Sequence, residues 1–285
     1  MAPSVEGLVE NCSKLISLPE VAIRVNSMVG DPGVSAAEIG EVISQDPALT
    51  TSLLKIANSP LFGLSREVDT VSRAVTVLGG KQIRDLVLAS SAADAFKGIP
   101  NDMLSMENFW HHSLCCALAA QELAGLSRIR KIESVFIAGL LHDIGLLLIY
   151  NKVPELAVES IMLSLDQSKA LSLNQAERQV MGFDHAQLGG ALIKAWALPE
   201  SLQACVTFHH EPAAAESHKV EVALTHIANS IAHLIETDSS SLDNIQIIEP
   251  AAWLVTGLSE EVIKDVIASV RDKVTEMQAV LKMGG

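Results

Sequence analysis

The residues with the clearest capacity for chemistry are His142 and Asp143, which stand side by side in an otherwise apolar stretch. Apart from this pair, residues 136–149 are all apolar or glycine. Burying a carboxylate in such surroundings costs free energy unless a hydrogen bond or a cation compensates. An adjacent imidazole and a bound metal ion would both stabilise the charge of Asp143. The pair therefore predicts a metal site, or the remnant of one.

Further histidines could complete this site from other parts of the chain, namely His112, His185, His209 and His210. Borderline divalent metals favour imidazole nitrogen and carboxylate oxygen, and helical proteins bring such ligands together from several helices. The cofactor predicted is a divalent metal. The residues do not distinguish Fe, Mn, Zn, Mg and Ni, or one ion from two.

Each histidine also has a simpler interpretation. A single residue such as His112 is commonly an ordinary core or surface side chain, and His209 and His210 could complement a helix dipole beside Pro212. Asp143 is harder to explain without a partner, because its neighbours are apolar. We give the simpler interpretation to the remaining histidines, His111, His218, His226 and His233.

Composition predicts an all-α protein of one large or two smaller domains. Of the 285 residues, 49% are hydrophobic but only 4% are aromatic, which favours packed helices over a β-sandwich. The formal net charge of −14 argues against nucleic acid as a partner, because binding its backbone needs clustered lysine and arginine.

The cysteines and the apolar segments predict a cytoplasmic protein. Cys12, Cys115, Cys116 and Cys205 form no CxxC pair and suggest no disulfide framework, which fits a reducing compartment. Residues 1–6 do not resemble a signal peptide. The apolar run around His142 is interpreted as too short and too polar at its centre to span a membrane.

Local sequence signals place the candidate ligands on helices. Ser105 is the expected N-cap of the helix that carries His112, and Asp184 opens a capping box that puts His185 in a first turn. His142 and Asp143 are expected within a helix, and His209 and His210 at the end of another. Further helix starts are expected at Ser35, Asp46, Thr70, Ser172 and Lys219.

A final helix, from about Ser259, carries an apolar stripe. Packing of this stripe onto the body of the protein is the simpler expectation, and a homodimer interface is the alternative. The stripe consists of Val262, Val266, Val270, Val274 and Leu281.

Several segments together resemble the HDOD domain family. The resemblance covers roughly residues 10–235, and the combination of motifs is specific although no single motif is. Its segments are residues 43–50 (ISQDPALT), 53–60 (LLKIANSP), 72–75 (SRAV) with Leu78 and Gly79, 109–113 (FWHHS) and 140–145 (LLHDIG).

The resemblance implies a two-lobed helical fold and a bacterial signalling or regulatory role. The boundary is expected between an N-terminal lobe at residues 1–98 and an HD-like lobe with C-terminal helices at 99–285. HDOD domains are related to the HD superfamily of metal-dependent phosphohydrolases and to HD-GYP phosphodiesterases. By that pattern the implied metal ligands are His112, His142, Asp143, His185, His209 and His210.

Three departures from the HD-GYP pattern weaken the expectation of hydrolysis. Asn229 stands where the closing aspartate is expected, and Leu146 stands where a lysine follows the HD pair. No Gly-Tyr-Pro motif follows His210. Cations that could contact a phosphate are expected only if the fold brings them near, and they are Arg73, Lys81, Arg84 and Lys194.

Three functions remain open at this point. The first is a signalling module whose metal site is structural, regulatory or ligand-sensing, with a signalling protein or a small anionic ligand as partner. The second is a metal-dependent phosphohydrolase in which Asp143 bridges two metals or orients a water molecule. The third is a metal or redox sensor that uses Cys115 and Cys116 beside His112, although buried cysteines usually act as small hydrophobic residues.

Overall fold

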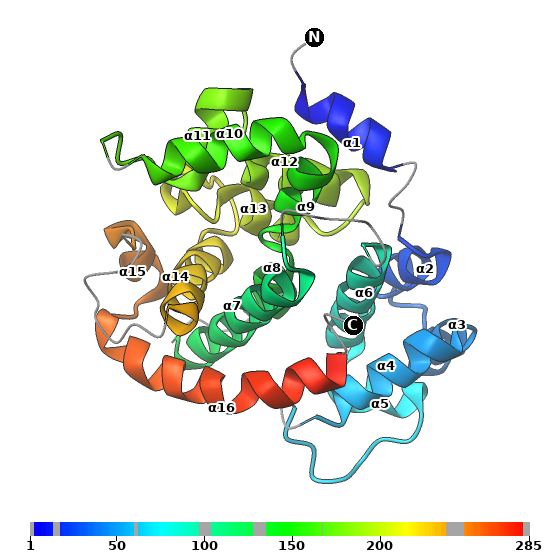
Figure 1. The fold of residues 1–285 in the computed structure, drawn as a ribbon. Helices are drawn as coiled ribbons and strands as arrows, with labels where there is room; N and C mark the ends of the chain where they lie inside the picture. Colours follow the sequence, from blue (N-terminus) through cyan, green and yellow to red (C-terminus); the bar gives the residue numbers. More distant parts are fainter. Residues whose placement is uncertain are drawn as a thin grey trace.

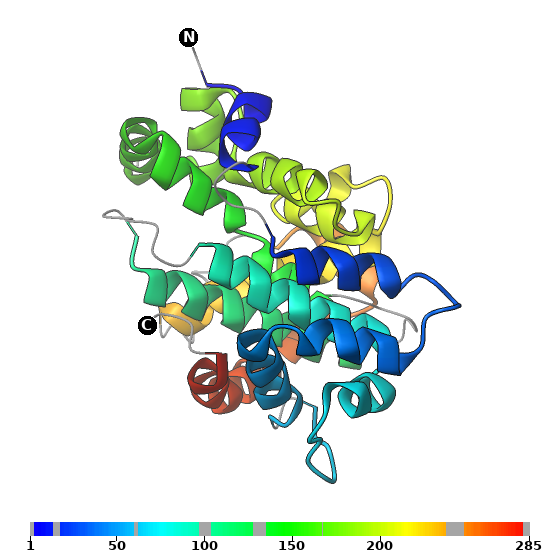
Figure 2. The ribbon, with the colours of Figure 1, turned by 90° about the vertical axis from the view of Figure 1, so that its right-hand side faces the viewer.

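The computed structural model describes residues 3–13, 18–59, 62–96, 104–127, 135–166, 168–237 and 248–281. Within these ranges the chain forms helices and no β-strand, as its composition predicts. Figures 1 and 2 show the helices of residues 20–95 gathered beside a larger helical group, while the helix at residues 5–13 lies apart from them against that larger group. The predicted break at residues 98–101 lies outside the described residues.

The first group of helices begins where the sequence signals place them. Ser35 and Glu38 form the expected capping box, and the side chains of Asp46 and Thr70 accept hydrogen bonds from the first turns that follow them. The elements are α1 (Val5–Ser13), α2 (Glu20–Met28), α3 (Ala36–Ser44), α4 (Pro47–Ala57), α5 (Val71–Leu78) and α6 (Gly80–Ala95).

The second group supplies the candidate ligands. Ser105, Ser172 and Asp184 all cap helices as expected. The elements are α7 (Met106–Leu126), α8 (Val135–Leu141), α9 (Ile144–Lys152), α10 (Pro154–Leu165), α11 (Leu173–Met181), α12 (His185–Ala195), α13 (Glu200–Phe208), the short 3₁₀ helix η1 (Pro212–Ala214) and α14 (Lys219–Glu236).

The prediction that His142 and Asp143 lie within a helix is wrong. Helix α8 ends at Leu141 and α9 begins at Ile144, so the pair occupies a turn between them. Asp143 is the N-cap residue of α9, with φ −97° and ψ 10°. Both helices are apolar on all sides, so the two-residue interruption left no mark on the hydrophobic pattern. The turn frees both side chains to point toward other helices.

The apolar stretch at 135–152 needs a second correction. By length and composition it is apolar enough to cross a membrane, but 83% of it is buried inside the fold, as expected for core helices of a folded domain. Its burial, rather than its length, is what distinguishes it from a membrane span.

The chain ends in α15 (Pro250–Thr256), the 3₁₀ helix η3 (Glu260–Val262) and α16 (Ile263–Leu281). Val266, Val270 and Val274 are buried, and α16 packs against α4, α7 and α14 along the lower edge of Figure 1. The predicted stripe is therefore interior packing; the side chain of Leu281 lies outside the described residues.

Two terminal helices contact elements from the other half of the chain. Helix α1 packs against α9 and α12, and α16 packs against both α4 and α7. The lobe boundary near residue 98 remains a prediction.

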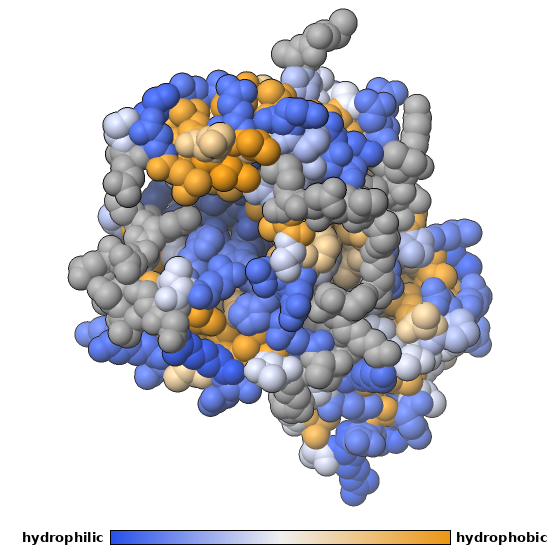
Figure 3. Space-filling model, viewed as in Figure 1, coloured by the Kyte–Doolittle hydropathy of each residue, from blue (hydrophilic) through white to orange (hydrophobic). Residues whose placement is uncertain are grey.

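Helix α10 leaves three apolar side chains exposed on one face. Val158, Met162 and Leu165 are spaced at helical intervals, and Figure 3 shows hydrophobic surface gathered in the upper part of the molecule, where α10 and α11 lie.

Candidate metal centre

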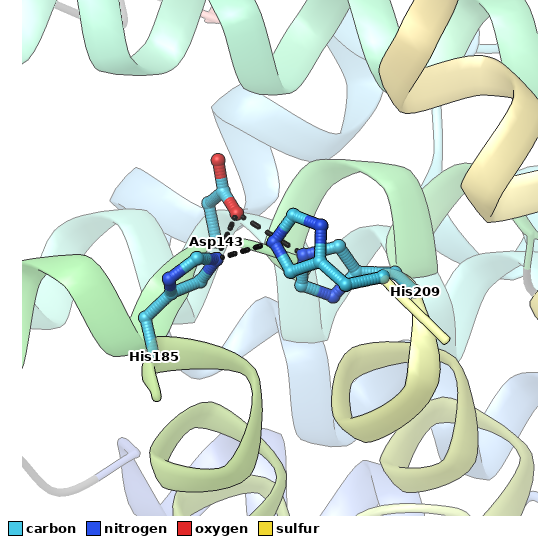
Figure 4. A group of neighbouring side chains, drawn as sticks. Asp143, His185 and His209 are labelled. Atoms are coloured by element: carbon cyan, nitrogen blue, oxygen red, sulfur yellow. Dashed lines mark hydrogen bonds and ion pairs between the residues drawn. The ribbon is translucent and has the colours of Figure 1, made fainter. Parts of the chain in front are cut away.

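The structure brings all six predicted ligands to one place, around the carboxylate of Asp143. His112 comes from the second turn of α7, His185 is the first residue of α12, and His209 and His210 directly follow α13. Figure 4 shows His185 and His209 turned toward Asp143. Side chains from α7, from the turn between α8 and α9, from the start of α12 and from the end of α13 thus converge on a single buried carboxylate.

One oxygen of Asp143 faces two histidines, and a third histidine lies beside them. Asp143 Oδ1 lies 3.3 Å from His185 Nε2 and 3.4 Å from His209 Nε2. His210 Nε2 lies 2.8 Å from His185 Nε2. These four residues can each offer one ligand atom within 4.8 Å of the others. We call this group the Oδ1 position.

The other oxygen faces a different pair. Asp143 Oδ2 lies 3.3 Å from His142 Nε2 and 3.7 Å from His112 Nε2. Asn229 Oδ1, from α14, lies 3.1 Å from His112 Nε2, so the amide lies beside this pair of ligands. We call the group of His112, His142 and Asp143 Oδ2 the Oδ2 position.

Backbone contacts behind the rings fix how two of these histidines present their nitrogens. His142 Nδ1 lies 2.8 Å from the Gly139 carbonyl oxygen, and His209 Nδ1 lies 2.8 Å from that of Val206. A carbonyl only accepts, so each Nδ1 donates its hydrogen, and in a neutral ring the Nε2 lone pair faces Asp143. His142 Nε2, His209 Nε2 and Asp143 Oδ1 are buried without a hydrogen-bond partner.

Lone pairs that face a carboxylate repel it, and buried polar atoms rarely stay unpaired. A cation between them removes both problems. Metal–nitrogen bonds of about 2.0–2.1 Å place neighbouring ligand atoms about 3.0–3.4 Å apart, and the separations around Asp143 fall near this range. The residues present therefore fit a divalent metal.

The electrostatics of the cluster also draw positive charge inward. Burial opposes the ionised form of Asp143, but the neighbouring imidazoles, His142 first and then His185 and His209, hold its pKa well below the ordinary value. Burial likewise opposes the charged form of His185, yet Glu177 and Asp143 raise its pKa well above normal. Burial lowers the pKa of His209 to about 4, which keeps that ring neutral and ready to donate a lone pair.

Sequence reasoning missed two carboxylates that contact the outer nitrogens of the ligands. Glu177 is buried in α11, and its Oε2 lies 2.6 Å from His185 Nδ1 and 2.8 Å from the backbone nitrogen of His185. Glu236, at the end of α14, has Oε2 3.1 Å from His112 Nδ1. Carboxylates commonly orient metal-bound histidines in this way. The one available signal for Glu236 was its helical spacing from Asn229 and His233 on α14.

Glycines allow the helices around Asp143 to approach closely. A Cβ atom on Gly145 would collide with the His185 carbonyl oxygen, and a Cβ on Gly139 would lie 2.7 Å from the Ala117 Cα atom. These contacts join α9 to α12 and α8 to α7. Glycine is thus required at both flanks of the His142–Asp143 turn.

The four cations that the sequence offered as phosphate contacts do not appear among the ion pairs that Asp143 forms with described residues. In the described parts of the chain the ion-pair partners of Asp143 are histidines. Arg73, Lys81 and Lys194 are exposed, and Arg84 pairs with Asp85. A cation that sequence reasoning missed, Arg178, pairs with Asp184 and with Glu211, which follows His210.

The cysteine-based sensor loses support. Cys115 and Cys116 are buried in α7, and burial raises the pKa of Cys115 to about 12. The thiolate, the form that binds metals and reacts, is therefore disfavoured. The Cys115 sulfur instead lies 3.8 Å from Nδ1 of His111, the residue that precedes His112.

Comparison with protein families finds one family domain that covers most of the chain. The HDOD domain matches residues 15–212. The chain belongs to the HDOD domain family. The match includes the Asp143 turn and every predicted ligand, so the centre lies within the family domain.

Solved structures resemble this HDOD chain over nearly its whole length. An HDOD domain protein of unknown function from Geobacter sulfurreducens is 25% identical, with 96% of each chain covered and a TM-score of 0.73. A protein from Shewanella amazonensis SB2B, provisionally assigned as a phosphohydrolase, is also 25% identical, with 96% of this chain and 97% of that one covered and a TM-score of 0.74.

An uncharacterised protein from Treponema pallidum is 25% identical over 223 residues, which are 78% of this HDOD chain. The match spans only 43% of the length of that relative.

Proposed function

We propose that this HDOD protein holds two divalent metal ions around Asp143 and acts as a signalling or regulatory module in the cytoplasm. The observation that supports the proposal is the division of the Asp143 carboxylate between two sets of histidines. Each oxygen has its own set, at 3.3–3.4 Å for the nearest rings.

The two positions offer different ligands. The Oδ1 position would use Asp143, His185, His209 and His210, and the Oδ2 position would use Asp143, His142 and His112. Asn229 adds a neutral oxygen beside the second set. We expect the Oδ1 position to bind its ion more tightly, because it has one more imidazole.

A regulatory role is favoured because, among the described residues, the ion-pair partners of Asp143 are histidines rather than the lysine or arginine that would hold a phosphate. Leu146 provides a buried apolar side chain where the HD-GYP pattern has lysine. The carboxylates Glu177 and Glu236 flank the ligands, and the chain carries a net charge of −14, so the field does not favour an anionic substrate. The proposed partner is a signalling protein, or a small anionic ligand whose negative charge the bound metal offsets; a second copy of this chain is the alternative partner.

Phosphoester hydrolysis is the second candidate, and the bridging position of Asp143 favours it. Two metals held 3.5–4 Å apart, a typical spacing for such sites, lower the pKa of bound water and polarise a phosphoryl oxygen. In that case Asp143 would contribute one oxygen to each metal position and orient the attacking water, while the histidines would serve as the remaining metal ligands. The Shewanella protein with the same fold is provisionally assigned to this class.

One experiment separates the two candidates. The protein is purified without added metal, its metal content is measured by elemental analysis, and loaded protein is then assayed with bis(p-nitrophenyl) phosphate and with cyclic dinucleotides. Bound metal without turnover supports the regulatory role. Metal-dependent turnover that Asp143→Asn abolishes would establish the hydrolase, and the absence of bound metal would refute both.

A further inference from the structure

A second cluster of ligand atoms adjoins the metal centre on its solvent side. His112 Nδ1, His233 and Glu236 can each offer one atom, and these atoms lie within 4.8 Å of one another. Glu236 Oε2 lies 3.1 Å from His112 Nδ1 and 3.6 Å from His233 Nδ1. We call this group the outer cluster. The sequence did not predict this cluster, because His233 was interpreted there as an ordinary core or surface histidine.

The outer cluster is more accessible than the centre. The side chains of His233 and Glu236 are 38% and 30% exposed, whereas that of His112 is 9% exposed. His112 Nδ1 itself is buried and makes no well-aligned hydrogen bond. It is thus a buried nitrogen that contacts the Glu236 carboxylate without an aligned hydrogen bond, on the side where two further ligand groups lie.

His112 belongs to both groups, through different ring nitrogens. Its Nε2 faces Asp143 and Asn229, and its Nδ1 faces Glu236. A neutral imidazole has one lone pair. When Nδ1 carries the hydrogen, that hydrogen lies on the side of Glu236 and the Nε2 lone pair points inward. When Nε2 carries it, the Asn229 carbonyl accepts it and the lone pair points to the outer cluster.

We propose that the outer cluster is a loading position, which captures a divalent ion from solvent and passes it to the Oδ2 position. The two positions alternate because they compete for the single lone pair of His112. Asn229 permits the exchange, since its neutral carbonyl accepts the Nε2 hydrogen that the outer state requires. This inference rests on the proposed metal centre.

A simpler role for Glu236 must be distinguished from this one. Glu236 could only orient His112, as carboxylates do for many metal-bound histidines. That role needs no contribution from His233, whose ring lies 4.6 Å from the His112 ring and pairs with the same carboxylate. His233→Ala therefore separates loading from orientation.

The test follows the uptake of Co²⁺, a spectroscopic probe, by chelator-stripped full-length protein in a stopped-flow instrument. The variants are His233→Ala and Glu236→Gln. The matched control is Glu221→Gln, which removes a carboxylate from the same helix 15 residues, or about 22 Å, away. Bound Co²⁺ at equilibrium is counted in each protein.

We expect both variants to load at least about fivefold more slowly than the wild type and the control, with the same final Co²⁺ content. In a His142→Ala background, which weakens the Oδ2 position, an ion should remain in the outer cluster and be lost when His233→Ala is added.

Loading of His233→Ala at the wild-type rate would overturn the inference while leaving the metal centre intact, including when Glu236→Gln alone is slow. Wild-type protein that binds no Co²⁺ would overturn the metal centre itself. If His142→Ala does not fold, the loading rates of His233→Ala and Glu236→Gln still decide the test.

Discussion

Glu177 Oε2 lies 2.6 Å from His185 Nδ1, so a buried carboxylate stands behind a ligand that faces Asp143. The same oxygen also accepts a hydrogen bond from the His185 backbone nitrogen. Because both contacts involve the first residue of α12, Glu177 fixes the start of that helix and the direction of its first side chain. Glu177 is thereby a positioning residue for the Oδ1 position.

Glu177→Gln should weaken metal binding without removing a ligand. The amide is similar in shape but lacks the charge that makes His185 a stronger donor. Loss of such a contact typically costs 10–100-fold in metal affinity, and we expect a change of about that size. Competition titration with a Zn²⁺ chelator measures it.

The matched control is Glu155→Gln, an exposed carboxylate on α10. It should leave the affinity unchanged. Equal affinities in Glu177→Gln and the control would show that Glu177 has no part in holding His185.

Gly145→Ala should destabilise the protein by forcing α9 away from α12. The added Cβ would meet the His185 carbonyl and lie 2.8 Å from the Gly189 nitrogen, and overpacking of this kind costs about 1–3 kcal/mol. Urea unfolding gives the change in the free energy of unfolding.

Gly125→Ala provides the opposite control, because nothing lies within 4 Å of a Cβ at that position in α7. There alanine should stabilise the helix by about 0.5–1 kcal/mol. If both substitutions change the free energy of unfolding in the same direction, the close contact between α9 and α12 at Gly145 does not explain the effect of Gly145→Ala.

The parts of the fold that the sequence predicted are those set by local chemistry. The capping boxes at Ser35 and Asp184 were visible because their donors and acceptors are three residues apart. The helical composition likewise follows from residue counts. The ligand set followed from family resemblance, with Asp143 as the residue that needed a partner.

The parts that were missed depend on contacts between distant segments. Asn229 and His112 are 117 positions apart, and no local signal shows that their side chains meet at 3.1 Å. The turn at His142 was hidden because both flanking helices are buried on all sides. Glu177 looked like an ordinary helical carboxylate until packing against α12 placed it behind His185.

Cys205 should make stability fall at alkaline pH. Burial raises its pKa in the folded protein to about 12, whereas an unfolded thiol titrates near 8.5. Between these values the unfolded chain loses a proton that the folded chain keeps. The contribution of the buried thiol is therefore complete below about pH 8.5 and decreases as pH rises, by up to about 1.4 kcal/mol per pH unit.

The measurement is the free energy of unfolding from pH 7.5 to 10.5 for wild type and Cys205→Ala. Other groups titrate in this range, so the difference between the two slopes is the informative quantity. A steeper decline in the wild type supports the assignment, and parallel curves would contradict it.

The most direct test of the metal centre is the number of tightly bound Co²⁺ or Zn²⁺ ions per chain in the wild type and in Asp143→Asn. Because the two Asp143 oxygens serve separate positions, the account predicts two ions in the wild type and a loss at both positions in the variant. Circular dichroism should show that the variant keeps its helices. A wild-type chain without bound metal, or a folded Asp143→Asn that binds as the wild type does, would contradict the account.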